Sequence, residues 1–361
     1  MMHLVTAPSV DFSIGSYSIS KQQKPFVIAE AGGNHNGLLS QAIRLIEVAA
    51  ESGADAVKFA LSRADTQYAP NSISQDFNND GYELTAYELI KKREVPFSWI
   101  PVLSKCASEQ GIQFMASSFD YETTDILGQC DVSAYKIASY ECTHIPLIRH
   151  IASKNKPVIL SVGLASYAEI DDAVQTLLSY GNRKIVLLHC IASYPAPIPN
   201  TNLYIMNELS RRFNCLTGIS DHSTDPHIIP IASTVLGAAV IEKHFTLSKR
   251  LPGADHPFAL EPNELKEMVD SIDSAHICLG TTDKRISPPE ECTLALARRT
   301  IFSTEHIFPG DAFTEQNTRI LRRGGHPMGL LPKHYDKLLT LTSPCEIDAY
   351  QIIPEDVINH G

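Results

Sequence analysis

Ionisable and hydroxyl side chains recur at the ends of short apolar runs in this sequence. Glu30 ends the run at 26–29 and is followed by Gly32, Gly33 and a group of polar residues. Packing alone would disfavour this pattern, because burying an unpaired charge costs several kcal/mol. A functional role for these side chains would explain why they are there. The later runs end on Lys58, Ser117, Ser118, Lys136, Ser139, Ser161, His189, Ser220, Asp221, His222, Lys243 and His244.

These side-chain types suit the recognition of an anion and the binding of a divalent metal. Lys58 and Lys136 supply positive charge and the serines supply neutral donors, so together they fit a phosphate or a carboxylate. His222 and His244 end neighbouring runs, and two histidines with a carboxylate or water suit a divalent transition metal. Glu30 would act as a general base or as a further metal contact.

Each of these residues also has an ordinary structural interpretation. A serine at a strand end is more often a helix N-cap than a ligand. A lone histidine usually satisfies a local hydrogen bond, and residues 34–36 fit a loop that leads toward Ser40. The metal hypothesis therefore rests on the joint placement of His222 and His244.

Eight strands that alternate with helices would bring these residues together. Helical patterns fill residues 39–53 and 167–181, where apolar residues recur at spacings of three and four and each pattern ends in glycine. Eight strand–helix units in about 260 residues fit a (β/α)8 TIM barrel, whose active site forms where the carboxyl ends of the strands meet. An open doubly wound sheet is less suitable, because the chain lacks a GxGxxG turn. We expect strands at 26–30, 56–60, 113–118, 134–139, 158–163, 185–190, 216–222 and 239–246.

The rest of the chain indicates a second, smaller domain. Residues 1–283 hold the expected barrel, and residues 284–292 form a polar linker with a Pro-Pro pair. Residues 293–361 contain short β-like runs between turn signals, such as the Pro-Gly-Asp at 309–311. We therefore expect a barrel, a linker and a small β-rich domain.

The composition argues against several classes of protein. The chain has 361 residues and a formal net charge of −11, which disfavours nonspecific nucleic-acid binding because that requires a basic patch. Apolar runs stay well below the roughly 20 residues that span a bilayer, and the N-terminal residues lack a signal-peptide pattern. Eight scattered cysteines without a CxxC pair are typical of reduced thiols. We expect a cytoplasmic protein that binds neither nucleic acid nor a membrane.

The ordered set of motifs resembles the sialic acid synthase family, which includes the legionaminic and pseudaminic acid synthases. The segment from "ARRTIF" to "RILRRGG" resembles the antifreeze-like, or SAF, domain of that family. The resemblance covers nearly the whole chain in the same order, and it implies a TIM barrel followed by a SAF domain. The barrel motifs that carry it are "IAEAGGNHNG", "SGADAVKF", "ASSFD", "LLHCIASYPAP", "GISDHS", "EKHFT" and "PGADHPFALEP".

The resemblance implies that phosphoenolpyruvate condenses with an N-acetylated mannosamine-type sugar and that phosphate leaves by C–O cleavage. It also implies a divalent metal, manganese before magnesium or cobalt, that His222 and His244 hold and that polarises the sugar aldehyde. Glu30 matches the acidic residue near the reacting carbons. The other matches are Lys58, Ser117, Lys136, Ser139, Ser161 and Ser220 for phosphoenolpyruvate, and Tyr194, Asp255 and Arg323 for the sugar.

Arg323, or the adjacent Arg322, matches an arginine that the SAF domain of one subunit inserts into its partner's site. The resemblance thus implies a domain-swapped homodimer. The chain departs from the family pattern at Ala60 and Ala192, which bears on the sugar more than on the reaction. Two other functions stay open on the sequence: another phosphoenolpyruvate-condensing 3-deoxy-sugar-acid synthase or aldolase barrel, and a catalytically idle barrel that acts as a binding protein.

Overall fold

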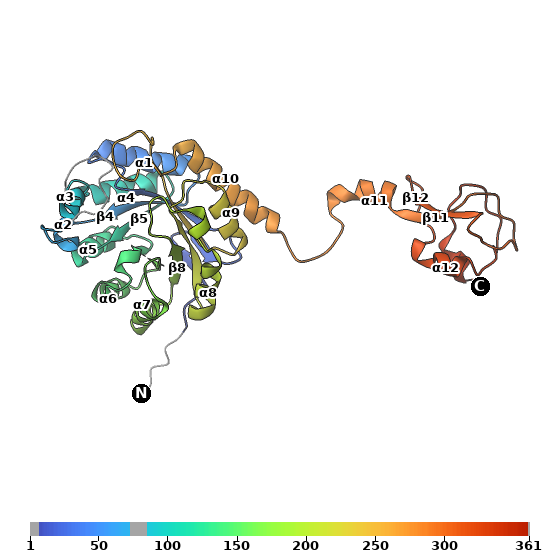
Figure 1. Ribbon diagram of the computed structural model, residues 1–361, viewed down its shortest axis with the longest axis horizontal. Coiled ribbons are helices and arrows are strands. Elements are labelled where there is room, and N and C mark those ends of the chain that lie inside the picture. Colours follow the sequence, from blue (N-terminus) through green and yellow to red (C-terminus); the bar gives the residue numbers. More distant parts are fainter. Residues whose placement is uncertain (1–6, 73–84, 360–361) are drawn as a thin grey trace, which may run out of the picture. The chain divides into compact units, whose positions relative to one another are not determined.

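The protein forms two compact units, which a computed structural model describes over residues 7–72 and 85–359 (Figure 1). The first, the barrel unit, ends at Gly280, and the second, the C-terminal unit, begins at Thr281. Residues 284–292, expected as a linker, include the 3-10 turn η4 (Pro288–Glu290) and the start of helix α11 (Glu291–Ala297). None of the helices in the described ranges is long and apolar enough to cross a bilayer.

The barrel unit is a closed barrel of eight parallel strands, as the sequence predicts. Each strand neighbours its successor in the chain, and the last strand pairs with the first to close the ring. The strands are β3 (Phe26–Gly32), β4 (Ala56–Leu61), β5 (Gln113–Ser118), β6 (Tyr135–Ile137), β7 (Val158–Ser161), β8 (Ile185–Cys190), β9 (Leu216–Asp221) and β10 (Val240–His244).

Helices surround this barrel and bury their apolar faces against its outer surface (Figure 1). Sequence signals mark some of the helix ends: α7 starts after Ser166, which forms a capping box with Glu169, and the chain leaves α1 through Gly53 at a φ of 84°. The helices are α1 (Leu39–Glu51), α2 (Ala64–Gln67), α3 (Ala86–Lys91), α4 (Ile100–Glu109), α5 (Tyr121–Gln129), α6 (Ile145–Ala152), α7 (Tyr167–Ser179), α8 (Tyr204–Phe213), α9 (Ile228–Val235) and α10 (Pro262–Leu279).

The inside of the barrel is apolar toward the amino ends of the strands. A short hairpin, β1 (Asp11–Ile14) and β2 (Tyr17–Ser20), packs Phe12, Ile14 and Ile19 into this apolar cluster. Successive residues of a strand point to opposite faces, so the residue two positions after each inward apolar residue also points inward. The polar residues near the carboxyl ends are therefore held at the barrel mouth. The inward apolar residues of the strands are Ile28, Ala56, Met115, Ala134, Ile159, Val186, Leu188, Leu216 and Val240.

The C-terminal unit is small and rich in short antiparallel pairings, which is consistent with a SAF domain. Strand β11 (Arg299–Ser303) pairs with β12 (Thr318–Arg322), and the chain also forms helix α12 (Tyr335–Leu338). Its own core includes Ile301 and Phe313, both buried. The unit therefore has an apolar centre separate from that of the barrel.

Candidate active site

A cavity of about 150 Å³ lies at the carboxyl ends of the barrel strands. It brings together every barrel residue to which the family resemblance assigns a role, although these residues come from strands and loops far apart in the chain. Its lining includes Glu30, Lys58, Ser117, Lys136, Ser139, Ser161, Tyr194, Ser220, His222, His244 and Asp255.

The strand register explains this convergence. Glu30 follows the inward Ile28 by two residues, and Lys58 follows the inward Ala56 in the same way. In the parallel pairing of β3 and β4, Glu30 and Lys58 are direct partners. Ser139 is an exception, because β6 ends at Ile137 and the serine begins the 3-10 turn η2 (Ser139–Glu141) rather than ending the expected strand.

Two lysines and two carboxylates form a neutral cluster in the floor of the cavity, and all four side chains are at most 5% exposed. Lys58 Nζ lies 2.7 Å from Glu30 Oε2 and 3.5 Å from Glu242 Oε1. Lys136 Nζ lies 3.8 Å from the same Glu242 oxygen. Low local polarity strengthens such attractions, and paired charges avoid the penalty of an isolated one.

Serine hydroxyl groups extend this cluster. Lys58 Nζ donates to Ser117 Oγ at 3.0 Å, and Lys136 Nζ donates to Ser161 Oγ at 2.7 Å. Each lysine is thus paired with a hydroxyl that can itself donate to an anion. Ser139 Oγ lies 2.9 Å from Cys190 Sγ and accepts a hydrogen bond from the Gly163 amide.

Glu242 is the main residue that the sequence reasoning missed. It lines the cavity beside the two lysines and accepts a hydrogen bond from Ser220 Oγ at 2.9 Å. The signal was present, because Glu242 precedes His244 by two residues in one strand and must share its face. Tyr140 and Cys190 also line the cavity and were not predicted.

Burial shifts the proton affinities in this cluster. It raises the pKa of Glu30 to about 7, an effect that Lys58 opposes and Glu242 reinforces. For Lys58, burial lowers the pKa, but the two carboxylates outweigh burial and hold the pKa above its ordinary value. A carboxyl group that titrates near neutral pH is suited to proton transfer.

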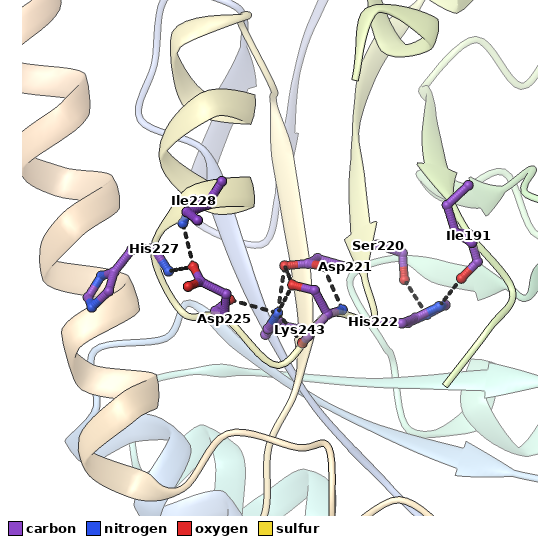
Figure 2. Close-up of polar contacts among 9 residues, drawn as sticks. Ile191, Ser220, Asp221, His222, Asp225, His227, Ile228 and Lys243 are labelled. Atoms are coloured by element: carbon purple, nitrogen blue, oxygen red, sulfur yellow. Dashed lines mark hydrogen bonds and ion pairs between the residues drawn. The ribbon is translucent and has the colours of Figure 1, made fainter. Parts of the chain in front are cut away.

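The two histidines meet at the mouth of the barrel, with ring centroids 5.4 Å apart. Figure 2 shows His222 between Ser220 and Ile191, where its Nδ1 donates to the Ile191 carbonyl oxygen at 2.7 Å. This bond leaves Nε2 without its proton, 3.4 Å from Ser220 Oγ. His244 Nδ1 is buried and has no hydrogen-bond partner among the described residues.

The histidine pair fits a divalent metal, although it supplies only part of a ligand set. Burial lowers the pKa of His222 to about 4 and that of His244 well below the ordinary value, so both rings are neutral, which is the form that binds metals. A carbonyl bond that fixes the tautomer is typical of metal-binding histidines. Within the described ranges no three His, Cys, Asp or Glu side chains converge as a metal site, so further ligands would come from water or substrate.

Aromatic and acidic side chains form one wall of the cavity. Tyr194 stacks on His222 with a centroid distance of 4.2 Å and meets His244 edge-on at 5.8 Å. Phe258 packs against both Tyr194 and His244. Asp255 Oδ2 lies 3.9 Å from His244 Nδ1. Both residues predicted to contact the sugar from the barrel therefore lie beside the histidine pair.

Several strand-end residues that the sequence places with the others do not reach the cavity. His189 bonds through Nε2 to the Thr201 carbonyl oxygen at 2.6 Å. Lys243 and Asp221 pair with each other at 2.6 Å on the outer face of the barrel wall. The expectation that these three join the shared mouth is wrong, because side chains alternate along a strand and each of them is offset by one residue from the inward set.

Two further residues lie outside the cavity lining. His35 is completely buried, and its ring packs edge-on against Trp99 at 5.7 Å, so it supports the loop after β3. Arg323 belongs to the C-terminal unit, where it follows β12 and its Nε donates to the His326 carbonyl oxygen at 2.7 Å. Its insertion into a partner's site stays a prediction.

A closed barrel whose mouth gathers lysines, carboxylates and neutral histidines defines a TIM-barrel protein with an enzyme-like polar site. Known proteins narrow this class. The sequence matches the NeuB family over residues 45–284. The chain therefore belongs to the NeuB family, as the resemblance predicts.

Individual relatives agree with this assignment over most of their length. The chain is 41% identical to the spore coat polysaccharide biosynthesis protein SpsE of Bacillus subtilis, with 91% of each chain covered. It is 38% identical to the N,N'-diacetyllegionaminic acid synthase of Legionella pneumophila, covering 87% of this chain and 89% of the relative. The structure of N-acetylneuraminic acid synthetase from Leptospira borgpetersenii, solved in complex with citrate, matches with a TM-score of 0.70 and 31% identity, covering 80% of this chain and 96% of the other.

Proposed function

We propose that the protein is a nonulosonic acid synthase that condenses phosphoenolpyruvate with an N-acetylated mannosamine-type sugar and releases phosphate. The synthase function itself follows from the relatives, which include acid synthases 38% and 36% identical to this chain. The observation that supports the substrates is the cavity floor, where Lys58 and Lys136 each hold a serine hydroxyl beside a buried carboxylate. An idle binding barrel has no need of such a cluster.

The lysine and serine pairs suit the two anionic ends of phosphoenolpyruvate. Lys58 with Ser117 forms one donor set, and Lys136 with Ser161 forms the other. Charge-assisted hydrogen bonds of this kind are stronger than neutral ones. Ser139 and Ser220 line the same cavity and add hydroxyl groups to the cradle. The enol phosphate would then lie against Glu30, which pairs with Lys58.

The sugar would lie along the aromatic wall, near the histidine pair. Tyr194 offers a ring face, and Asp255 offers a carboxylate for hydroxyl or amide groups. His222 and His244 would hold a divalent metal, with manganese preferred over magnesium or cobalt, and this ion would supply Lewis acidity to the open-chain aldehyde.

The reaction balances with one water molecule. Carbon C3 of phosphoenolpyruvate forms a bond with the aldehyde carbon of the sugar, and the aldehyde oxygen becomes a hydroxyl group. Water adds at C2, and the C2–O bond to phosphate breaks. Glu30 would take the proton of that water; its burial beside Lys58 and its pKa of about 7 support this role.

A substrate panel tests this function. The full-length protein is incubated with phosphoenolpyruvate, Mn²⁺ and a series of N-acetylated sugars, and phosphate release is followed. We expect release that depends on an N-acetylated amino sugar. An absence of sugar-dependent release with every sugar would contradict the synthase proposal. Release with arabinose 5-phosphate or erythrose 4-phosphate alone would instead support a 3-deoxy-sugar-acid synthase.

Removal of either cavity histidine is expected to weaken metal binding. We expect His222→Ala and His244→Ala each to lower Mn²⁺ affinity and kcat by at least about tenfold, because each variant removes one of two neutral imidazole ligands. Equilibrium Mn²⁺ binding and steady-state rates measure the effect. His276→Ala on α10, away from the cavity, is the control. Full activity of both cavity variants after chelation would refute the metal assignment.

The C-terminal arginine is expected to act on the sugar. We propose that Arg323 enters the site of a partner subunit in a homodimer, so Arg323→Ala should raise the KM of the sugar by about tenfold through loss of a charge-assisted bond. The KM of phosphoenolpyruvate should change less. Arg322→Ala, one residue earlier, is the matched comparison. A larger change in the KM of phosphoenolpyruvate would place the arginine at the other substrate.

A further inference from the structure

A buried ion pair lies beside His222 (Figure 2), between the two residues that directly precede the cavity histidines and point to the opposite face of the barrel wall. Lys243 Nζ is 2.6 Å from Asp221 Oδ2, and the two side chains are 1% and 2% exposed. In the pairing of β9 and β10, Asp221 and Lys243 are direct partners. Each therefore precedes a histidine of the pair in sequence while pointing away from it.

The lysine also ties the loop after β9 to the barrel wall. Its ammonium group donates to Ser223 Oγ at 3.0 Å and to the Asp225 carbonyl oxygen at 3.0 Å, and it bonds to the Ser223 carbonyl oxygen as well. Asp221 accepts from the Ser223 amide at 2.8 Å. The ammonium group has three protons, so these contacts with Asp221, Ser223 and Asp225 account for all of its donors.

The same loop starts the helix that follows. Asp225 Oδ1 accepts from the amides of His227 and Ile228 at 2.8 and 2.6 Å, at the N-terminus of α9 (Figure 2). A continuous set of bonds thus runs from Lys243 on β10, through the 223–225 loop, to α9. The backbone on both sides of His222 is part of it.

This network holds the backbone from which both imidazoles project. His222 stands between Asp221 and Ser223, whose positions the ammonium group fixes, while His244 directly follows Lys243. Metal ligands depend on residues that orient them without touching the ion, and loss of a residue bonded directly to a ligand typically weakens metal binding 10–100-fold. Asp221 and Lys243 act one step further away, through the backbone that carries the histidines. Neither Asp221 nor Lys243 lines the cavity, so their effect on the site acts through the histidines.

We propose that Lys243 and Asp221 are positioning residues that hold His222 and His244 at the separation required to bind a divalent cation. The proposal rests on the proposed metal role of the histidines. A positioning role can be separated from a role in folding alone. Replacement of a whole buried ion pair by neutral residues of similar volume often leaves stability unchanged.

The test uses the full-length double variant Asp221→Asn with Lys243→Met, which keeps the side-chain sizes and leaves no unpaired charge. Free Mn²⁺ is measured by electron paramagnetic resonance during a protein titration, and phosphoenolpyruvate binding is measured by calorimetry without metal. We expect the dissociation constant of Mn²⁺ to rise about tenfold, the lower end of the effect of losing a direct partner of a ligand, while that of phosphoenolpyruvate stays within about twofold of the wild-type value.

A second ion pair of the barrel unit provides the control. Lys249 and Glu264 are also 2.6 Å apart, but they bond neither to the 223–225 loop nor to a cavity histidine. Lys249→Met with Glu264→Gln should therefore leave both dissociation constants unchanged. A change in Mn²⁺ affinity in this control equal to that in the Asp221 and Lys243 variant would overturn the proposal.

The other possible binding results also test the positioning role of Lys243 and Asp221. Unchanged Mn²⁺ affinity in the double variant, or a parallel loss of Mn²⁺ and phosphoenolpyruvate affinity, overturns the positioning role. If the double variant does not fold, Ser223→Ala replaces it, and a Mn²⁺ affinity equal to wild type then overturns the role. Wild-type protein that binds phosphoenolpyruvate but not Mn²⁺ removes the metal assignment and this inference together, and leaves the substrate proposal standing.

Discussion

Replacement of Glu30 by glutamine is expected to lower kcat by about 10²–10⁴-fold, the usual contribution of a positioned general acid or base. The amide has nearly the same shape and still offers an oxygen to Lys58, which lies 2.7 Å from the carboxylate. It cannot accept the proton of the attacking water. The dissociation constant of phosphoenolpyruvate should therefore change far less than kcat.

The pH profile separates this role from a structural one. Burial raises the pKa of Glu30 to about 7, and a general base acts in its ionised form. The kcat/KM of the wild type should therefore rise with pH through about 7, and Glu30→Gln should lack this limb. Glu141→Gln is the matched control, because burial also raises the pKa of Glu141 but that residue does not line the cavity. An unchanged limb in Glu30→Gln would assign the ionisation to another group.

Replacement of Glu242 by glutamine is expected to lower the free energy of unfolding by about 3–5 kcal/mol at pH 7, the usual cost of breaking a buried ion pair on one side. Glu242 is the carboxylate nearest to Lys136 and also approaches Lys58. Its removal leaves Lys58 paired with Glu30 and takes away the carboxylate that lies 3.8 Å from the buried Lys136 ammonium group. Urea unfolding of both proteins, followed by circular dichroism, measures the difference.

The pKa of Glu242 determines how its contribution to the free energy of unfolding changes with pH. Burial raises this pKa, but Lys136 and Lys58 outweigh burial and hold it below the ordinary value of 4.5. The carboxylate therefore stabilises the fold above pH 4.5, and this contribution is lost as the pH falls through the lower pKa of the folded state. The difference between wild type and Glu242→Gln in the free energy of unfolding should therefore be constant from pH 7 to about pH 4.5 and should narrow only as the pH falls below 4.5.

A surface carboxylate provides the comparison for this second prediction. Glu208 pairs with Arg211 and Arg212 on α8 in contact with solvent. Solvent screens such pairs, so Glu208→Gln should change stability far less than Glu242→Gln. Equal losses in the two variants would show that the Glu242 cluster contributes no more than an exposed pair.

The barrel was predictable because its pattern is local. Glu30, Lys58 and Lys136 each end or nearly end an apolar run, and the alternation of such runs with amphipathic segments specifies eight strand–helix units. Parallel strands joined in this way place their carboxyl ends together, so the meeting of distant residues at one cavity followed from the count of strands. The family then followed from the order of the motifs.

The face on which each side chain lies was predicted less well. Glu242 was passed over in favour of Lys243, although the two are adjacent and only Glu242 lines the cavity. A shift of one residue in the register of a strand moves every side chain to the other face. The end of an apolar run identifies the position along the strand, whereas the inward Val240 is needed to fix the face.

The sequence by itself determined the barrel, the small β-rich C-terminal unit, the family and the residue types at the mouth, since these depend on composition, spacing and order along the chain. The tertiary structure alone decided the partners: Glu242 between Lys58 and Lys136, and Lys243 bonded to Asp221 beside His222. The physical reason is that the energy of a buried charge depends on neighbours a few ångströms away in space. For these residues the neighbours come from other strands, and only closure of the barrel brings them into contact.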